Sequence, residues 1–276
     1  MVKASKTRIL VESALMLAIA LVLSLITLIH LPYGGSVTVA SMLPIIVIAY
    51  RFGMGPGLLT GLAYGIIQQL LGLKNLSYVT GWQSVLAVIL LDYLIAFTVL
   101  GFGGIFSKKS RSQAQALVSG TIFVCVLRFI CHVISGATVW AGISIPTTAA
   151  LVYSMGYNAT YMIPETVVTA LAAYFIGISI DLCRLDPALM KTGNSDRFPW
   201  RKLLGALLVV FSISFAVVLA FSKLQDPETG SFMISGLKDV NWILMLAVSV
   251  PTLAGGIIFL TVPEAIARKK ETTSNE

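Results

Sequence analysis

The chain has 276 residues, of which 57% are hydrophobic and only 11% are charged, and its mean hydropathy is +0.91. This composition excludes a soluble globular domain and is typical of a polytopic membrane protein, because several apolar runs approach the ~20 residues that cross a bilayer. The formal net charge of +7 is also found in nucleic-acid-binding proteins, but the distribution of the basic residues along this chain argues against that class.

Eight apolar segments are predicted to be helical membrane spans, at residues 10–30, 38–51, 56–73, 83–102, 114–139, 150–181, 203–222 and 241–262. Of the nineteen Lys and Arg residues, fifteen then share the side of the N-terminus, while Lys74, Lys223 and Lys238 lie on the other side and Arg128 lies within a span. Basic residues gather on the cytoplasmic side of membrane proteins. The sequence therefore predicts that both termini are cytoplasmic, and it assigns the basic charge to orientation and to contact with the lipid bilayer, with no nucleic acid bound.

The first predicted span follows a basic N-terminus and is too long for the core of a signal peptide, so we expect it to be retained. It contains Ala14 and Ala18, a pair of small residues four apart that lets another helix approach closely. Periodicity leaves two uses open, packing within the chain and docking of a partner subunit. In the connection that follows, Tyr33 either covers a site beneath it or is an ordinary interfacial aromatic residue.

The fourth predicted span carries a carboxylate inside the bilayer. Asp92 lies about ten residues, or ~15 Å, from the outer end of this span and is followed by Tyr93. An unpaired carboxylate at this depth is costly, so Asp92 needs a cationic partner, a polar ligand, or both. An ion pair with Arg128 and a contact with a ligand are both open.

The fifth predicted span is unusually polar. Arg128, His132, Gly136 and Trp140 recur at every fourth residue, so on a helix of 3.6 residues per turn they form one slowly turning stripe. Ionisable residues in an apolar helix usually face the protein interior and are candidates for a functional site. A single buried histidine is more often a satisfied core residue than a ligand, and its neighbours decide between these readings.

The sixth predicted span adds Tyr153, Tyr157 and Asn158, and further along Glu165 follows Pro164. We expect Glu165 to pair with Arg128 in preference to contacting a ligand directly.

Five polar and aromatic residues from three spans are all predicted in the outer half of the bilayer: Asp92, His132, Trp140, Tyr153 and Asn158. This pattern predicts a cavity open to the outside, with aromatic faces for a flat ring and polar groups for its edge.

The sequence indicates recognition rather than catalysis. It contains no phosphate-binding loop, no HExxH, no G-x-S-x-G and no Cys/His cluster, so we expect no catalytic residue, metal or cofactor. Cys125, Cys131 and Cys183 are expected to be free thiols. An intramembrane enzyme that uses Asp92 and His132 is the alternative from another class.

These residues also resemble a known family. The motifs HVISGATVW and YSMGYNATYMIPE, with LLDY on an earlier span, are similar to those of the thiamine-specific substrate-binding (S) components of energy-coupling-factor (ECF) transporters. The resemblance covers about residues 8–183. It implies an all-α polytopic membrane protein with a six-helix S-component core (1–183). The rest of the chain has no counterpart in the usual six-span form, and its composition predicts a cytoplasmic linker (184–202), two accessory transmembrane helices (203–262) and a cytoplasmic tail (263–276).

The resemblance also implies a ligand, partners and a site. The ligand is thiamine, and the partners are the ECF transmembrane coupling subunit, which Ala14 and Ala18 would meet, and two ATPase subunits. Trp140 would stack on a thiamine ring, Asn158 and Asp92 would bond the aminopyrimidine edge, His132 would lie against the ligand, and Gly136 would leave room for it. The full set implied to bind substrate is Tyr33, Asp92, Tyr93, Arg128, His132, Gly136, Trp140, Tyr153 and Asn158.

Three positions depart from the family pattern. Asp92 stands where Glu is usual, Arg128 where Lys is usual, and Tyr33 where Trp is usual. Two related functions stay open, a binder of another vitamin or of a thiamine precursor such as hydroxymethylpyrimidine, and a stand-alone eight-span transporter.

Overall fold

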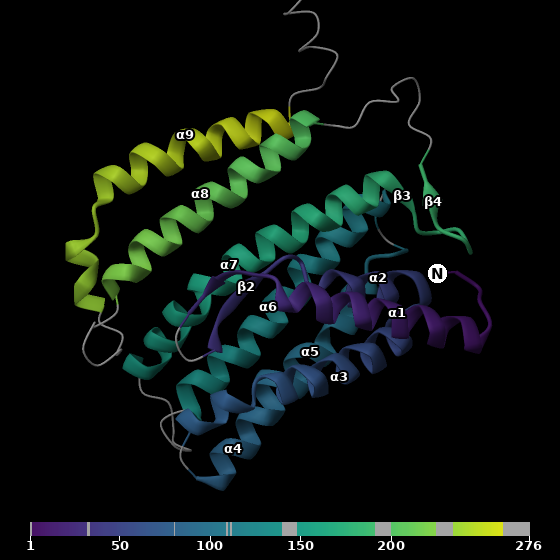
Figure 1. Cartoon of the computed structure of the whole chain (residues 1–276), viewed down its shortest axis with the longest axis horizontal. Helices are drawn as coiled ribbons and strands as arrows, with labels where there is room; N and C mark the ends of the chain where they lie inside the picture. The colour runs from purple at the N-terminus through teal and green to yellow at the C-terminus, as the bar shows by residue number, and fades with distance from the viewer. Residues whose placement is uncertain are drawn as a thin grey trace, which may run out of the picture. The chain divides into compact units, whose positions relative to one another are not determined.

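Long apolar helices dominate the structure (Figure 1). The computed structural model describes residues 2–31, 34–79, 81–108, 110, 112–139, 148–190, 200–224 and 234–261. The chain divides into two compact units, residues 1–191 and residues 192–276. The finer division at residues 183 and 202 stays a prediction.

The first unit is a helical bundle with two short hairpins. Its elements are α1 (Lys6–Leu25), β1 (Thr27–His30), β2 (Ser36–Thr38), α2 (Leu43–Phe52), α3 (Met54–Leu71), η2 (Leu73–Tyr78), α4 (Trp82–Val88), η3 (Ile89–Ile95), α5 (Ala96–Thr98), η4 (Val99–Gly104), α6 (Gln113–Thr138), α7 (Thr148–Ser179), β3 (Ile180–Asp181) and β4 (Ala188–Leu189).

Six helical segments among the described residues are long and apolar enough to cross a membrane. They are Lys6–Leu25, Trp82–Gly104, Gln113–Thr138, Ala150–Ser179, Arg201–Ala220 and Trp242–Thr261. The predicted span at 38–51 is corrected: helix α2 has only ten residues, so it is ~15 Å long and too short to cross ~30 Å of hydrocarbon. All ten of its residues are buried, so α2 is an internal helix of the bundle.

The predicted end of the first span is also corrected. Helix α1 stops at Leu25, and the chain continues as the antiparallel hairpin β1–β2, in which Thr27 is opposite Thr38 and His30 is opposite Ser36. The β-branched residues that follow α1 favour an extended backbone. The apolar run from α1 into β1 hides this change, because hydropathy alone does not separate a helix from a strand.

The fourth span is one continuous helical segment that changes its winding. The chain passes from α4 through the π-helical turn η3 and the short α5 into the 3-10 segment η4. Helix α3 lies against this segment through Gly57, Gly61 and Gly65. A Cβ added at Gly57 would lie 3.0 Å from the Gly101 Cα. A Cβ added at Gly61 or Gly65 would lie 2.5 Å from the Phe97 carbonyl oxygen or 2.8 Å from the Tyr93 carbonyl oxygen, respectively. The glycine stripe therefore serves close helix packing.

Helices α6 and α7 run alongside each other (Figure 1) and carry most of the polar residues singled out above. Ser112 caps the start of α6 by accepting from the Gln115 N–H at 3.2 Å. Pro164 lies inside α7. The core beneath this pair is formed by apolar side chains of α2 and α6, including Ile45, Ile46, Leu117 and Val124.

The second unit contains α8 (Trp200–Leu224), η5 (Ile234–Asp239) and α9 (Trp242–Thr261). Gly205 and Gly256 face each other, because a Cβ added at either would lie 2.8 Å from the carbonyl oxygen of the other. The Ser212 hydroxyl donates to the Ser249 carbonyl at 2.8 Å. These contacts make α8 and α9 a closely packed helix pair.

Candidate functional site

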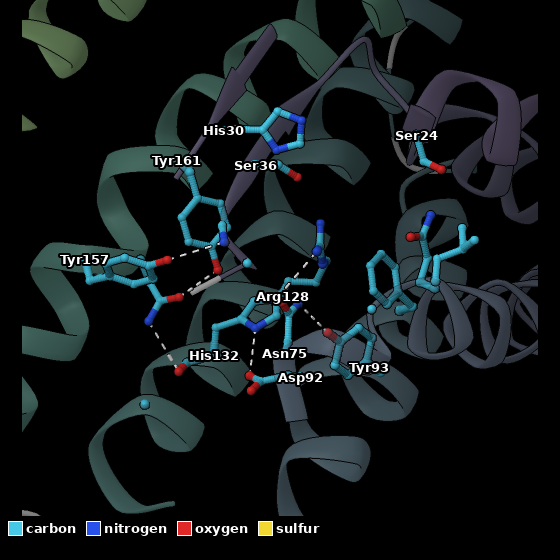
Figure 2. Close-up of a pocket in the computed structure, with 18 of the residues that line it drawn as sticks. Ser24, His30, Ser36, Asn75, Asp92, Tyr93, Arg128, His132, Tyr157 and Tyr161 are labelled. Carbon is cyan, nitrogen blue, oxygen red and sulfur yellow. Dashed lines mark hydrogen bonds and ion pairs between the residues drawn. The ribbon is translucent and has the colours of Figure 1, made fainter. Parts of the chain in front are cut away.

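A pocket of about 570 Å³ lies in the first unit. This volume is within the range of about 300–1,000 Å³ that is usual for small-molecule sites. Its lining comes from the end of α1, the β1–β2 hairpin, the end of α3, η2, η3, α6 and α7. In Figure 2, Tyr157 and Tyr161 lie on one side of the pocket and Tyr93 on the other, with His132 and Asp92 between them and His30 and Ser36 above.

Asp92 is held by two hydrogen bonds. Its Oδ1 lies 2.8 Å from His132 Nδ1, and its Oδ2 accepts from the Ser135 hydroxyl at 2.7 Å. The side chain is 11% exposed. Asp92 sits in the π-helical turn η3, and such turns occur often at functional sites. Both of these hydrogen-bond partners are on α6, so the carboxylate is fixed in the pocket wall.

Arg128 forms no ion pair with Asp92 among the described residues, although the sequence left such a pair open, and it makes other contacts. Its Nη2 lies 3.4 Å from His132 Nε2, its Nη1 contacts the sulfur of Met42, and its guanidinium lies 4.4 Å from the centre of the Phe97 ring. With the His132 proton on Nδ1, Nε2 is free to accept from Arg128. Hydrogen bonds therefore link Asp92 to His132 and His132 to Arg128 along the pocket.

Glu165 also differs from expectation. Its carboxylate accepts from the backbone N–H of Thr38 at 2.5 Å and from the Thr38 hydroxyl at 2.7 Å, and it forms no ion pair with Arg128 among the described residues. The physical reason is that the Thr38 N–H and hydroxyl of strand β2 lie within hydrogen-bond distance of the two carboxylate oxygens and take the place of the cation. Glu165 thus supports the hairpin.

One face of α7 presents aromatic rings to the pocket. Tyr153 and Tyr157 are stacked with an interplanar angle of 3° and centroids 6.4 Å apart, and Tyr157 meets Tyr161 edge to face at 5.9 Å. Tyr161 donates to the Asn158 side-chain oxygen at 2.7 Å, and the Asn158 NH₂ donates to the Ser154 and His132 carbonyls at 2.9 and 3.3 Å. These bonds orient the amide and the rings together.

Gly136 lets α6 and α7 approach closely at the pocket wall. A Cβ at this position would lie 2.3 Å from Ser154 Oγ and 3.6 Å from Asn158 Nδ2. The room that Gly136 provides is therefore room for α7 as well as for a ligand.

The opposite wall is formed by η2 and η3. The Asn75 NH₂ donates to the Tyr93 hydroxyl at 2.9 Å. Gly72 lies against the same ring, because a Cβ added at Gly72 would lie 2.4 Å from the Tyr93 hydroxyl oxygen. Gln68 and Phe97 complete this side. The hairpin covers the top with His30, Gly34, Gly35 and Ser36.

Seven of the nine residues predicted to bind substrate line this pocket: Asp92, Tyr93, Arg128, His132, Gly136, Tyr153 and Asn158. Tyr33 and Trp140 lie outside the described residues, so their positions stay predictions. Ala14 and Ala18 do not line the pocket, and both are exposed on α1.

Several pocket residues were not among those predicted to bind substrate. Tyr157 and Tyr161 follow Tyr153 at steps of four, and that spacing is a signal that identifies them. Asn75 and Ser24 give no such signal, because each stands near a helix end where polar residues are common. The structure describes no group of three or more His, Cys, Asp or Glu residues able to hold a metal among the residues searched.

Comparison with known proteins identifies relatives of the first unit. Residues 10–183 match the model of the family described as "Thiamine transporter protein (Thia_YuaJ)". Thiamine transporter ThiT of Bacillus subtilis (strain 168) is 36% identical over 173 residues, which are 59% of this chain and 86% of that protein. ThiT of Lacticaseibacillus paracasei is 28% identical over 177 residues, covering 58% of this chain and 82% of that protein.

A solved structure is also similar. ThiT from Listeria monocytogenes superposes with a TM-score of 0.50 and 25% sequence identity, covering 61% of this chain and 92% of that chain. This match confirms the all-helical membrane fold that the sequence predicted. Beyond the matched part, α8 and α9 each contain a segment long and apolar enough to cross a membrane, as the sequence also predicted.

Proposed function

Because the chain belongs to the thiamine transporter protein family, we propose that it is a high-affinity thiamine-binding subunit that takes thiamine from the extracellular side of the membrane. The family consists of membrane transport proteins, so the alternative of an intramembrane enzyme is set aside. The observation that carries the proposal is one pocket of about 570 Å³ in which a carboxylate, a histidine, an asparagine amide and stacked tyrosines meet.

The chemistry of these groups suits thiamine. Thiamine is a cation with two flat rings, one of them an aminopyrimidine with hydrogen-bond donors and acceptors on its edge. Tyr153 and Tyr157 offer aromatic faces, and cation–π attraction for a desolvated cation contributes about 1–2 kcal/mol. Asp92 supplies the complementary charge, and Asn158 and His132 supply polar groups for the pyrimidine edge. In this proposal Trp140 stacks on a ring of the ligand.

A titration tests this proposal. Purified protein is titrated with thiamine while tryptophan fluorescence is followed. We expect Trp140→Ala to abolish most binding and Asn158→Ala to weaken it strongly, because Asn158 holds the Tyr161 hydroxyl and faces the pocket. Asn241→Ala is the matched control, because Asn241 caps α9 in the second unit by accepting from the Leu244 N–H. Parent-like binding by both pocket variants would contradict the site.

Competition distinguishes thiamine from a precursor. A hydroxymethylpyrimidine lacks the thiazolium ring and its cation–π contact. We therefore expect it to compete far more weakly than thiamine. A pyrimidine that matches the affinity of thiamine would instead favour a precursor-binding subunit.

We further propose that this subunit works with an ECF transmembrane coupling subunit and two ATPase subunits, with both termini in the cytoplasm. Ala14 and Ala18 support this, because both are exposed on α1 at a spacing that admits another helix. The variant Ala14→Trp/Ala18→Trp is expected to bind thiamine normally but to lose uptake. Ala254→Trp, on the exposed face of α9, is the control. Uptake in a host that lacks the ATPase module would favour a stand-alone transporter.

A further inference from the structure

The β1–β2 hairpin forms the top wall of the pocket and is too small to be stable alone. Its strands have four and three residues, and an isolated two-stranded hairpin is at best marginally stable in water. It nevertheless presents His30, Gly35 and Ser36 to the pocket. Contacts with the rest of the bundle must therefore hold it in place.

Among the described residues, two hydrogen-bonded contacts join the hairpin to α7, and they differ in strength. Near the tip, the Gly35 N–H donates to the Tyr157 hydroxyl at 3.3 Å, a single bond between neutral groups. At the base, both oxygens of the Glu165 carboxylate accept from Thr38, one from the backbone N–H and one from the hydroxyl. Each hydrogen bond typically contributes about 0.5–1.5 kcal/mol, so two bonds to one side chain hold more strongly than one. The base of the hairpin is thus the stronger attachment.

This attachment is enclosed by protein. Glu165 is 5% exposed and Thr38 is 7% exposed, and Ser41 Oγ lies 2.8 Å from the Thr38 hydroxyl. Glu165 and Arg128 both line a smaller hollow of about 80 Å³, which shares Ser24, Phe97 and other lining residues with the main pocket. The carboxylate therefore faces polar groups and a nearby positive charge, which makes its burial tolerable.

Glu165 also continues the ligand-facing side of α7. Tyr153, Tyr157, Tyr161 and Glu165 follow one another at steps of four, so they share one face of the helix. The element that presents aromatic rings to the ligand therefore also holds the wall above them.

We propose that Glu165 is a positioning residue of this site. It fixes strand β2 against the tyrosine face of α7, so that the hairpin stays closed over the pocket and slows the dissociation of the ligand. This inference rests on the proposed thiamine-binding function and adds a role for a residue that does not itself line the main pocket.

Dissociation kinetics test the role. Glu165→Ala removes both acceptors, and we expect the rate of thiamine dissociation to rise on the order of tenfold or more with little change in association. Glu165→Gln is expected to restore a rate within about threefold of the parent, because its amide oxygen accepts from the Thr38 N–H and its NH₂ donates to the Thr38 hydroxyl. Thr169→Val is the matched control, since Thr169 is fully buried on the same helix but lines neither hollow.

A second pair of variants guards against a folding defect at position 165. Thr38→Val removes the hydroxyl bond and leaves Glu165 in place, whereas Thr38→Ser keeps the hydroxyl. We expect faster dissociation for Thr38→Val and a parent-like rate for Thr38→Ser. Glu165→Gln behaving as badly as Glu165→Ala, or Thr38→Val behaving as Thr38→Ser, would overturn the proposal.

Hydrogen exchange in ligand-free protein separates this inference from the proposed function. We expect the amides of residues 27–31 and 34–38 to exchange faster in Glu165→Ala and Thr38→Val, but not in Glu165→Gln, Thr38→Ser or Thr169→Val. Unchanged exchange of these amides in Glu165→Ala would contradict the anchor. If the variants show these differences in exchange but the parent protein does not bind thiamine, the role of Glu165 in holding the hairpin stands and the proposed function is refuted.

Discussion

Two clusters of buried charge lie at opposite ends of α1 in the first unit, and they are built differently. Near the N-terminal end, Arg51 is 1% exposed, and its guanidinium bonds Glu12 and the carbonyls of Leu182, Arg184 and Leu185. At the pocket end, Arg128 is 8% exposed, but its Nε has no hydrogen-bond partner among the described residues, and it faces a hollow of about 570 Å³.

The comparison shows that a buried charge is not by itself a binding site. Arg51 ties α2 and α1 to the segment after α7, and each of its three guanidinium nitrogens donates a hydrogen bond in doing so. Asp92, His132 and Arg128 are linked to each other but border open space. The first cluster should therefore control stability, and the second should control binding.

The largest effect is expected from Arg51→Met. It leaves Glu12 and three carbonyls without the buried cation, and breaking such an arrangement typically costs about 3–5 kcal/mol of folding free energy. We expect a strongly lowered thermal midpoint, with thiamine affinity per folded molecule unchanged. Arg8→Met is the control, because Arg8 is partly exposed and should lower the midpoint much less. Lost affinity in folded Arg51→Met protein would break the comparison.

Asp92→Asn should show the opposite pattern. Asn still accepts a hydrogen bond but removes the negative charge that faces His132 and the ligand. We expect thiamine affinity to fall roughly tenfold to a hundredfold, with the ligand-free thermal midpoint little changed. Titration and thermal unfolding measure the two quantities, and Asp239→Asn in the second unit is the control. A midpoint lowered as far as in Arg51→Met, at parent affinity, would assign Asp92 to structure.

Gly136→Ala sharpens the comparison because Gly136 serves both packing and the pocket. The added methyl group would lie 2.3 Å from Ser154 Oγ, and overpacking of this kind costs about 1–3 kcal/mol. We expect lower stability and weaker thiamine binding together. Adding Ser154→Ala should recover much of the stability, and Gly55→Ala, which meets no atom within 4 Å, should be close to neutral. No recovery in the double variant would contradict the contact.

The smallest effect is expected from Asp186→Asn, at the exposed edge of the Arg51 cluster. The hydrogen bond from Arg8 lowers the pKa of Asp186. A lowered folded-state pKa contributes stability above the ordinary carboxyl pKa of about 4, and this contribution is lost as the pH falls through the lowered value. We expect Asp186→Asn to lower the thermal midpoint slightly at pH 7, and the difference from the parent to vanish at low pH. A difference in thermal midpoint between Asp186→Asn and the parent that grows as the pH falls would contradict this prediction.

Part of the site could be predicted from the sequence because its signals are local. Arg128, His132 and Gly136 recur at steps of four on one helix, and this spacing alone places them on one side. The polar residues of the fourth and sixth spans were expected to meet them, and Asp92, Tyr153 and Asn158 do line the same pocket. Tyr33 and Trp140 remain predictions.

Other features depend on contacts between distant segments. The sequence left Arg128 open as a partner of Asp92 and predicted it as the partner of Glu165. The structure pairs Asp92 with His132 and Glu165 with Thr38 instead. Charge alone suggests which groups attract each other, but helix packing decides which of them come within reach.

The sequence by itself determined that this is a helical membrane protein with a polar site between its helices, because hydropathy and helical periodicity are properties of single segments. Only the tertiary structure decided that residues 27–38 form a hairpin over that site, that α2 is an internal helix, and that η3 winds as a π-helical turn. The hairpin depends on backbone pairing between two short strands, and the internal place of α2 depends on packing against other helices. Such interactions leave no periodic pattern in the sequence.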